Sequence, residues 1–280
     1  MIDAFQPKRL LAATDLSESN IAALRYARML AERYRTTLTV MYSDLTLRQA
    51  ELRESVEEFV DPILRGVPYE VFVTGGSPST MIARTAAEKN ADLLVIGTHG
   101  QHGWRRALLG SVAEAVLHTA HIPVLTVSRH TPLPVQGPVA ITRIVCPTNF
   151  GGVAGDSLRM AGSIAAAFNA ELIVVHVVEE LAGADEGRIR RQVGPELARV
   201  CSFRPIVVRG DAAERILDCA DDVGADLLVV GAQRKLFRDE TVIGSTTEHL
   251  VRCATCPVLT VTRAAASRSL VQRLELVEAR

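Results

Sequence analysis

The chain has 280 residues, a formal net charge of −1 and a hydrophobic content of 48%. This length suits two compact domains of roughly 140 residues each, and the aliphatic content is high enough to exclude intrinsic disorder in either half. The near-neutral charge provides no overall field for nucleic acid or for an anionic membrane surface. Aromatic residues make up only 4% of the chain, which argues against a platform for stacking single-stranded bases.

No targeting or membrane-spanning segment is expected. The N-terminus lacks the basic and then apolar pattern of a secretory signal. The longest apolar runs, such as Leu93–Ile96 and Leu227–Val230, have the length of strands and are too short to cross a bilayer. The five cysteines all lie in one half and do not indicate a disulfide framework. We therefore expect a reduced, cytoplasmic protein.

An internal repeat determines the expected domain organisation. The segment ADLLVIG at 91–97 returns as ADLLVVG at 225–231, and PVLTVSR at 123–129 returns as PVLTVTR at 257–263, both with an offset of 134 residues. A constant offset indicates a duplicated domain with little insertion or deletion between the copies. The expected parts are a first domain at 1–130, a Pro- and Gly-rich linker at 131–140, a second domain at 141–265 and a C-terminal tail at 266–280.

Each copy alternates strand-like and helix-like segments. In the first copy we expect, in chain order, strand 9–14, helix 21–31, strand 37–42, helix 47–64, strand 69–74, helix 78–89, strand 92–97, helix 111–118 and strand 123–127. Asp15, Ser17 and Glu18 follow the first strand and suit a helix start. Nearly continuous aliphatic strands between helices predict an α/β fold, with a doubly wound parallel sheet covered on both faces.

The candidate site lies beyond the carboxyl ends of the strands, where a doubly wound sheet binds its ligand. Gly97 and Gly100 follow the fourth strand, and Gly110 with Ser111 opens the next helix. Glycine lets a phosphate approach the backbone, and a helix N-terminus offers free N–H groups. Asp15, at the tip of the first strand, suits ribose hydroxyls or a nucleotide-bound Mg²⁺. By themselves these residues also suit a tight loop followed by an N-cap.

The spacing G-x2-G-x9-G-S after a strand, together with A-T-D-x-S at 13–17, resembles the nucleotide-binding branch of the universal stress protein family. The resemblance covers nearly the whole chain, twice over. It implies two tandem Rossmann-like domains of the HUP type, each with a five-stranded parallel sheet in the order 3-2-1-4-5. It also implies ATP as the ligand, alone or with Mg²⁺.

The resemblance places three groups of residues around this ligand. Those on the adenine and ribose side are Ala13, Thr14, Asp15 and Ser43, with Ser43 acting through its backbone. Those around the ribose and phosphates are Gly97, His99 and Gly100, and those at the terminal phosphates are Gly110, Ser111 and Val112. Ala13 departs from the family pattern, which often has proline there.

The second copy keeps the spacing of the glycine motif but has fewer of the residues expected to bind the nucleotide. Matching positions are Val177, Gly231, Gly244 and Ser245. Arg234 stands where the first copy has Gly100, and Asn149 stands where it has Asp15. The arginine either blocks the loop by its bulk or meets a phosphate with its charge. We expect weak or absent nucleotide binding in the second copy.

A Cys-x2-Cys pair near the end of the second copy superficially suggests a metal site. In the repeat, Cys253 aligns with Thr119 and Cys256 aligns with Ile122. These are a small residue near a helix end and an apolar residue before the last strand. We therefore interpret both cysteines as packing residues and expect no metal site built from the protein alone.

Three functions remain open. The leading hypothesis is a stress-response regulator in which ATP occupancy changes the loop around 97–111 and thereby the choice of a protein partner. The alternatives are a slow ATPase or nucleotidyl-transfer enzyme, and a nucleotide-free, chaperone-like interaction module. The sequence has no Walker A motif and no evident acid–base pair, so we expect no catalytic residue and at most weak hydrolysis.

The family resemblance also implies pairing of domains through their last strands. PVLTVSR and PVLTVTR contain edge strands that need a cover. We expect these two strands to pair within the chain, so that the copies form a pseudo-dimer, and we expect chains to associate further into a homo-oligomer.

Overall fold

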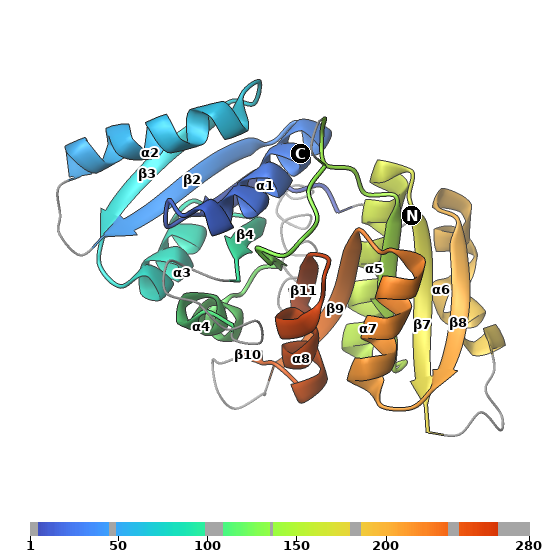
Figure 1. Ribbon diagram of the computed structural model, residues 1–280. Coiled ribbons are helices and arrows are strands. Elements are labelled where there is room, and N and C mark those ends of the chain that lie inside the picture. Colours follow the sequence, from blue (N-terminus) through green and yellow to red (C-terminus); the bar gives the residue numbers. More distant parts are fainter. Residues whose placement is uncertain are drawn as a thin grey trace, which may run out of the picture.

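The structure is a computed structural model that describes residues 5–44, 49–98, 109–134, 137–179, 186–234 and 241–262. It consists of two α/β domains that lie side by side (Figure 1). The elements of the first are β1 (Arg9–Ala13), a 3₁₀ turn (Glu18–Asn20), α1 (Ile21–Tyr34), β2 (Thr37–Asp44), α2 (Gln49–Leu64), β3 (Tyr69–Gly75), α3 (Pro78–Glu88), β4 (Leu93–Gly97), α4 (Ser111–Thr119) and β5 (Val124–Val127). Those of the second are β6 (Arg143–Pro147), α5 (Gly152–Phe168), β7 (Glu171–Val178), α6 (Glu186–Val200), β8 (Phe203–Arg209), α7 (Ala212–Val223), β9 (Leu227–Arg234), β10 (Thr241–Val242), α8 (Ser245–Cys253) and β11 (Val258–Thr262).

The strand order confirms the predicted fold class. The first domain has the parallel order β3-β2-β1-β4-β5, and the second repeats it as β8-β7-β6-β9-β11. Strand β1 lies between β2 and β4, with Ala13 opposite Met41 on one side and Ile96 on the other. The chain therefore changes winding direction between β1 and β4, and their carboxyl ends form the switch point at which such sheets bind ligands.

The two domains share one continuous sheet. Strand β11 pairs antiparallel with β5, so that Val258 faces Thr126 and Leu259 faces Leu125. Thr126 Oγ1 also donates a hydrogen bond to the carbonyl oxygen of Val258, at 3.0 Å. The expected pairing of the last strands within one chain is thus present. Because the pairs within β3-β2-β1-β4-β5 and within β8-β7-β6-β9-β11 are all parallel, the carboxyl ends of these strands in the two domains point in opposite directions.

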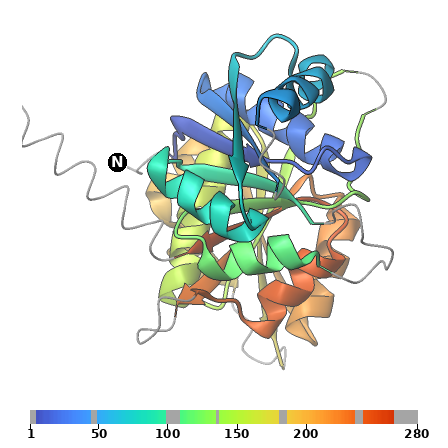
Figure 2. The ribbon, with the colours of Figure 1, turned by 90° about the vertical axis from the view of Figure 1, so that its left-hand side faces the viewer.

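Alternate residues of the strands feed two cores, one on each face of the shared sheet. Leu10 belongs to the core under α1, α2, α5 and α6, whereas its neighbour Leu11 belongs to the core under α3, α4, α7 and α8. The helices therefore form two layers with the sheet between them (Figure 2). Among the described residues, no helix combines the length and apolar character needed to cross a membrane.

Helix α5 packs against α6 at a glycine. A Cβ atom at Gly162 would lie 2.0 Å from Cδ1 of Leu197, which is itself buried. The contact explains why this helix position lacks a side chain even though glycine is a poor helix former.

We expect Gly162→Ala to lower the free energy of unfolding by about 1–3 kcal/mol, because the new methyl group overpacks the contact between α5 and α6. Urea denaturation followed by circular dichroism measures this change. The matched control is Gly155→Ala in the same helix, where a Cβ meets only Arg159 Nη1 at 3.7 Å. That variant should gain about 0.5–1 kcal/mol. Equal stability of the two variants would contradict the packing assigned here.

Candidate functional site

The tip of β1 is a turn that its own side chains hold. The Asp15 carboxylate accepts hydrogen bonds at Oδ1 from the Ser17 backbone N–H (3.0 Å), the Ser17 hydroxyl (2.5 Å) and the Asn20 side-chain amide (2.5 Å). Leu16 adopts a positive φ of 61°. The polar residues expected to suit a helix start form this turn, and a 3₁₀ segment follows at Glu18–Asn20. Helix α1 begins at Ile21, as the sequence predicts.

Asn20 connects this turn to the tip of β4. Its side chain is buried, with 4% of its surface exposed, and a Cβ atom at Gly97 would lie 2.8 Å from its Oδ1. Gly97 is thus required for packing, because any side chain there would displace the amide that orients Asp15. Sequence reasoning missed Asn20. The available signal was its replacement by Ala154 at the equivalent position of the repeat.

The tip of β2 lies on the other side of β1. The Thr14 backbone N–H donates to the carbonyl oxygen of Met41 (3.0 Å), and the Ser43 hydroxyl donates to the carbonyl oxygen of Gly76 (2.8 Å). Tyr42, which was not predicted as a site residue, lies close to Asp15. Burial first, and then the nearby Asp44 and Asp15 carboxylates, raise the pKa of this phenol, so it stays neutral at physiological pH.

The N-terminus of α4 is tied to the tip of β4. The Gly110 N–H donates to the carbonyl oxygen of Thr98 at 2.7 Å, and no side chain caps the helix at Gly110. Ser111 is exposed and Val112 is half-buried. Amides in the first turn of a helix have no partner within that helix and carry a partial positive charge.

The structure thus brings together most of the residues predicted for the first domain. They are Ala13, Thr14, Asp15, Ser43, Gly97, Gly110, Ser111 and Val112, at the tips of β1, β2 and β4 and the start of α4. His99 and Gly100 lie outside the described residues. Within the described residues, this arrangement offers one oriented carboxylate and, at the switch point, a helix N-terminus whose N-cap residue Gly110 has no side chain to cap it.

The second domain repeats the turn with different neighbours. Phe150 has a positive φ of 62°, and Asn149 Oδ1 accepts from the Gly151 N–H at 3.0 Å. Ala154 replaces Asn20 in the repeat, and the space beside Gly231 is filled by Val153, whose Cγ1 would lie 2.6 Å from a Cβ atom at this glycine. A cavity of about 220 Å³ adjoins the turn. Its walls include Asn149, Ala154, Val175, Val177, Gly231 and Thr247.

The described side chains that line this cavity are all uncharged. Thr247 donates through its hydroxyl to the Gly231 carbonyl oxygen at 3.0 Å, and Thr148 donates to Gln192 Oε1 at 2.7 Å. Strand β9 continues past Gly231 to Arg234, where its backbone pairs with Thr241 of β10. The predicted Gly244 and Ser245 are exposed at the start of α8. The Arg234 side chain lies outside the described part of the chain.

An aromatic stack adjoins the same turn in the second domain. The Phe150 ring contacts His176, with 4.5 Å between the ring centroids, and Arg188, whose Cζ is 4.0 Å from the Phe150 centroid. The equivalent positions for the two rings in the first domain are Leu16 and Tyr42. The two switch points therefore share a backbone turn but present different side chains.

The Cys-x2-Cys pair belongs to the end of α8 rather than to either switch point. Cys253 is exposed, whereas Cys256 is buried and burial raises its pKa to about 12. Within the described ranges, no cluster of three or more ligand-type side chains could hold a metal ion.

Comparison with known proteins assigns the family. The model of the universal stress protein family matches residues 7–128 and again residues 140–262. The chain belongs to the universal stress protein family. It is 31% identical over 140 residues to a universal stress protein of Methanocaldococcus jannaschii, a match that covers 44% of this chain and 82% of the relative. A putative universal stress protein of Staphylococcus aureus is 30% identical over 156 residues, covering 49% and 94%.

Solved structures support the tandem fold. A universal stress protein from Archaeoglobus fulgidus aligns with a TM-score of 0.75 at 23% identity, covering 92% of this chain and all of that one. A putative universal stress protein from Pseudomonas aeruginosa aligns with a TM-score of 0.70 at 19% identity, covering 95% and 97%. These identities establish the fold alone. A universal stress protein in complex with cAMP has a TM-score of 0.37 at 25% identity, covering 44% and 98%, and that TM-score is too low to transfer a ligand to this chain.

We expect Asn20→Ala to lower the free energy of unfolding by about 1–3 kcal/mol, because Asp15 loses a donor and the space above Gly97 is emptied. Chemical denaturation at pH 7 measures the loss. The isosteric Asn20→Asp should be destabilised as well, since two carboxylates then face each other, and the loss should shrink as acid protonates one of them. If Asn20→Asp is as stable as the wild type at pH 7, the contact between Asn20 and Asp15 assigned here is wrong.

Proposed function

We propose that the first domain binds an adenine nucleotide, ATP accompanied by Mg²⁺, and that the protein acts as a nucleotide-dependent stress-response regulator. One observation carries the proposal. The Asp15 carboxylate, which is held in a fixed orientation, and the N-terminus of α4, whose N-cap residue Gly110 has no side chain, both lie at the switch point. The backbone segments at Ala13–Asp15 and Ser43 serve the adenine and ribose side. Gly97, His99 and Gly100 serve the ribose and phosphates, and Gly110–Val112 serve the terminal phosphates.

The charges of the two groups suit opposite ends of a nucleotide. The first-turn amides of α4 supply donors and partial positive charge to phosphate oxygens. A carboxylate has several acceptor positions, so Asp15 can receive ribose hydroxyls beyond its contacts within the turn. Carboxylate oxygen is also a ligand type that Mg²⁺ uses alongside phosphate oxygens. Occupancy would change the surface around the start of α4, and we propose that a cytoplasmic protein partner reads this change.

We propose further that the second domain is the weaker nucleotide site. Its cavity is lined by uncharged described side chains, with Asn149 in place of Asp15. It therefore offers hydroxyl groups and apolar contacts but, among its described residues, no carboxylate to bind the ribose or a phosphate-bound Mg²⁺. A ligand that enters this cavity would be smaller or less charged than ATP.

Isothermal titration calorimetry of the full chain with ATP and Mg²⁺ tests the assignment. We expect one site per chain. Asp15→Asn should weaken binding about tenfold or more, since a hydrogen bond to a charged group is worth about 1.5–3 kcal/mol. Gly100→Arg, which places the second copy's residue in the first, should abolish it.

The matched control is Asn149→Ala at the equivalent turn of the second domain, which should leave the affinity unchanged. Two equal sites per chain would overturn the division between the domains. A folded wild-type protein that binds no ATP would overturn the nucleotide proposal and favour the nucleotide-free interaction module.

A further inference from the structure

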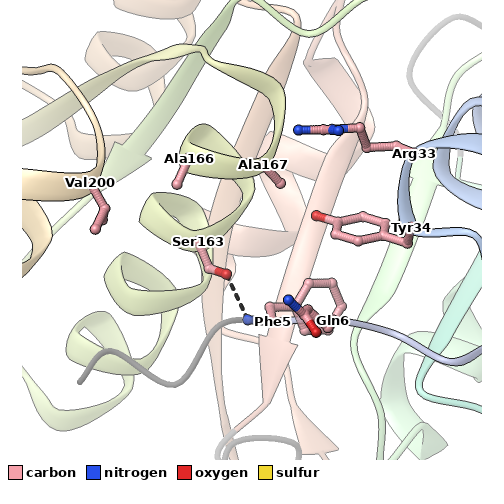
Figure 3. Close-up of a pocket in the computed structure, with 8 residues that line it drawn as sticks. All are labelled: Phe5, Gln6, Arg33, Tyr34, Ser163, Ala166, Ala167 and Val200. Carbon is pink, nitrogen blue, oxygen red and sulfur yellow. Dashed lines mark hydrogen bonds between the residues drawn. The ribbon is translucent and has the colours of Figure 1, made fainter.

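A groove separates the two domains on the helical face that carries α1 and α5. It has a volume of about 450 Å³ and shares no lining residue with the cavity of the second switch point. This volume falls in the size range of small-molecule sites, which often lie at domain interfaces. We call it the interdomain groove and define it by its lining residues (Figure 3). They are Phe5, Gln6, Arg33, Tyr34, Ser163, Ala166, Ala167 and Val200.

The groove forms where equivalent helix ends of the two copies meet. Arg33 and Tyr34 of α1 are equivalent in the repeat to Ala167 and Phe168 of α5. The Tyr34 and Phe168 rings touch edge to face with 6.0 Å between centroids. Next to this contact, the two equivalent positions carry side chains of different size, Arg33 in the first copy and Ala167 in the second. The small Ala167 side chain leaves room for the groove beside Arg33.

The N-terminal segment closes one side of the groove. The Phe5 backbone N–H donates to the hydroxyl of Ser163 on α5 at 2.6 Å, and the Phe5 ring packs edge to face on Tyr34 at 6.2 Å. Val200, at the end of α6, lies across the groove with 50% of its surface exposed. The wall is therefore mainly apolar and is fixed by contacts from both domains.

Two polar groups lie in this apolar setting. Arg33 is exposed and reaches along the groove, with its Cζ 5.7 Å from the Phe168 centroid, and within the described ranges no carboxylate forms an ion pair with it. The Tyr34 hydroxyl points across toward α5 (Figure 3) and is buried with no hydrogen-bond partner. Burial raises the pKa of Tyr34, so this hydroxyl remains a donor. None of the described residues that line the groove carries a negative charge.

The backbone carbonyl groups at the C-terminal ends of α1 and α5 already have hydrogen-bond donors. The Ala31 carbonyl oxygen of α1 accepts from the N–H groups of Arg35 and Thr36, and the Ala165 carbonyl oxygen of α5 accepts from those of Asn169 and Ala170. Caps of this kind satisfy last-turn carbonyls. The groove thus presents an exposed cationic side chain beside apolar surface, which suits a ligand with a negative charge and an apolar part.

We propose that the interdomain groove binds a small amphipathic anion, a carboxylate with an apolar body. Its carboxylate pairs with the Arg33 guanidinium, whose planar fork matches two carboxylate oxygens. Its apolar body lies against Ala166, Ala167 and Val200. This site is separate from the proposed nucleotide site, and neither proposal depends on the other.

The test is calorimetric titration of the full chain with decanoate. We expect saturable binding at one site per chain. Arg33→Gln should weaken it about tenfold or more, the effect of removing a charge-assisted pair. Ala167→Trp, which fills the groove, should abolish it. The matched control Arg65→Gln removes an exposed arginine at the end of α2 and should leave binding unchanged.

Two further measurements distinguish a specific site from nonspecific binding of an apolar chain. Decyltrimethylammonium, with the same chain and opposite charge, should not bind. Circular dichroism melts show whether each variant is folded. Because Arg33 is exposed, Arg33→Gln should fold normally and therefore tests the binding site even if Ala167→Trp does not fold. Wild-type protein that does not bind decanoate, or binding that Arg33→Gln leaves intact, overturns the proposal. A dimer that Ala167→Trp dissociates, without decanoate binding, would identify the groove as an interface between copies.

Discussion

The antiparallel pairing of β5 with β11 is the contact on which the rest of the structure depends. It joins two parallel sheets into one, and it covers the edge strand that each domain would otherwise expose. It also sends the carboxyl ends of the two sets of strands in opposite directions, which separates the two switch points. The same pairing brings α1 and α5 together on one face of the sheet, so the interdomain groove is a product of the seam as well.

Duplication preserved the backbone of the switch point while its side chains diverged. Leu16 and Phe150 share the same positive φ. In the first domain Asn20 fills the space above Gly97 and holds the Asp15 carboxylate, whereas in the second Val153 and Ser157 fill the space above Gly231 and Asn149 replaces the carboxylate. A few substitutions around an unchanged turn therefore replace a charged group at the switch point by an uncharged one. This is the physical basis for assigning the nucleotide to the first domain.

Much of the fold follows from the sequence because a repeat with constant offset forces two copies of one topology. The aliphatic strands between helices predicted a doubly wound parallel sheet with its site at the carboxyl ends of the strands, and the family resemblance implied the strand order. The packing role of Asn20 was not accessible, because it depends on the space between a turn and a strand tip some 77 positions later in the chain. Nor was the groove, since the contrast of Arg33 with Ala167 has meaning only once α1 and α5 are known to meet. The pairing of β10 with Arg234 was likewise invisible, because two residues make no strand pattern.

The most direct test of the central claim is to locate a bound nucleotide along the chain. Photoaffinity labelling with 8-azido-ATP in the presence of Mg²⁺, followed by peptide mass spectrometry, reads out the domain without assuming any residue. The account predicts that the label falls on peptides within residues 7–128 and that excess ATP removes it. Label concentrated on peptides within residues 140–262, or label that ATP does not displace, would contradict it.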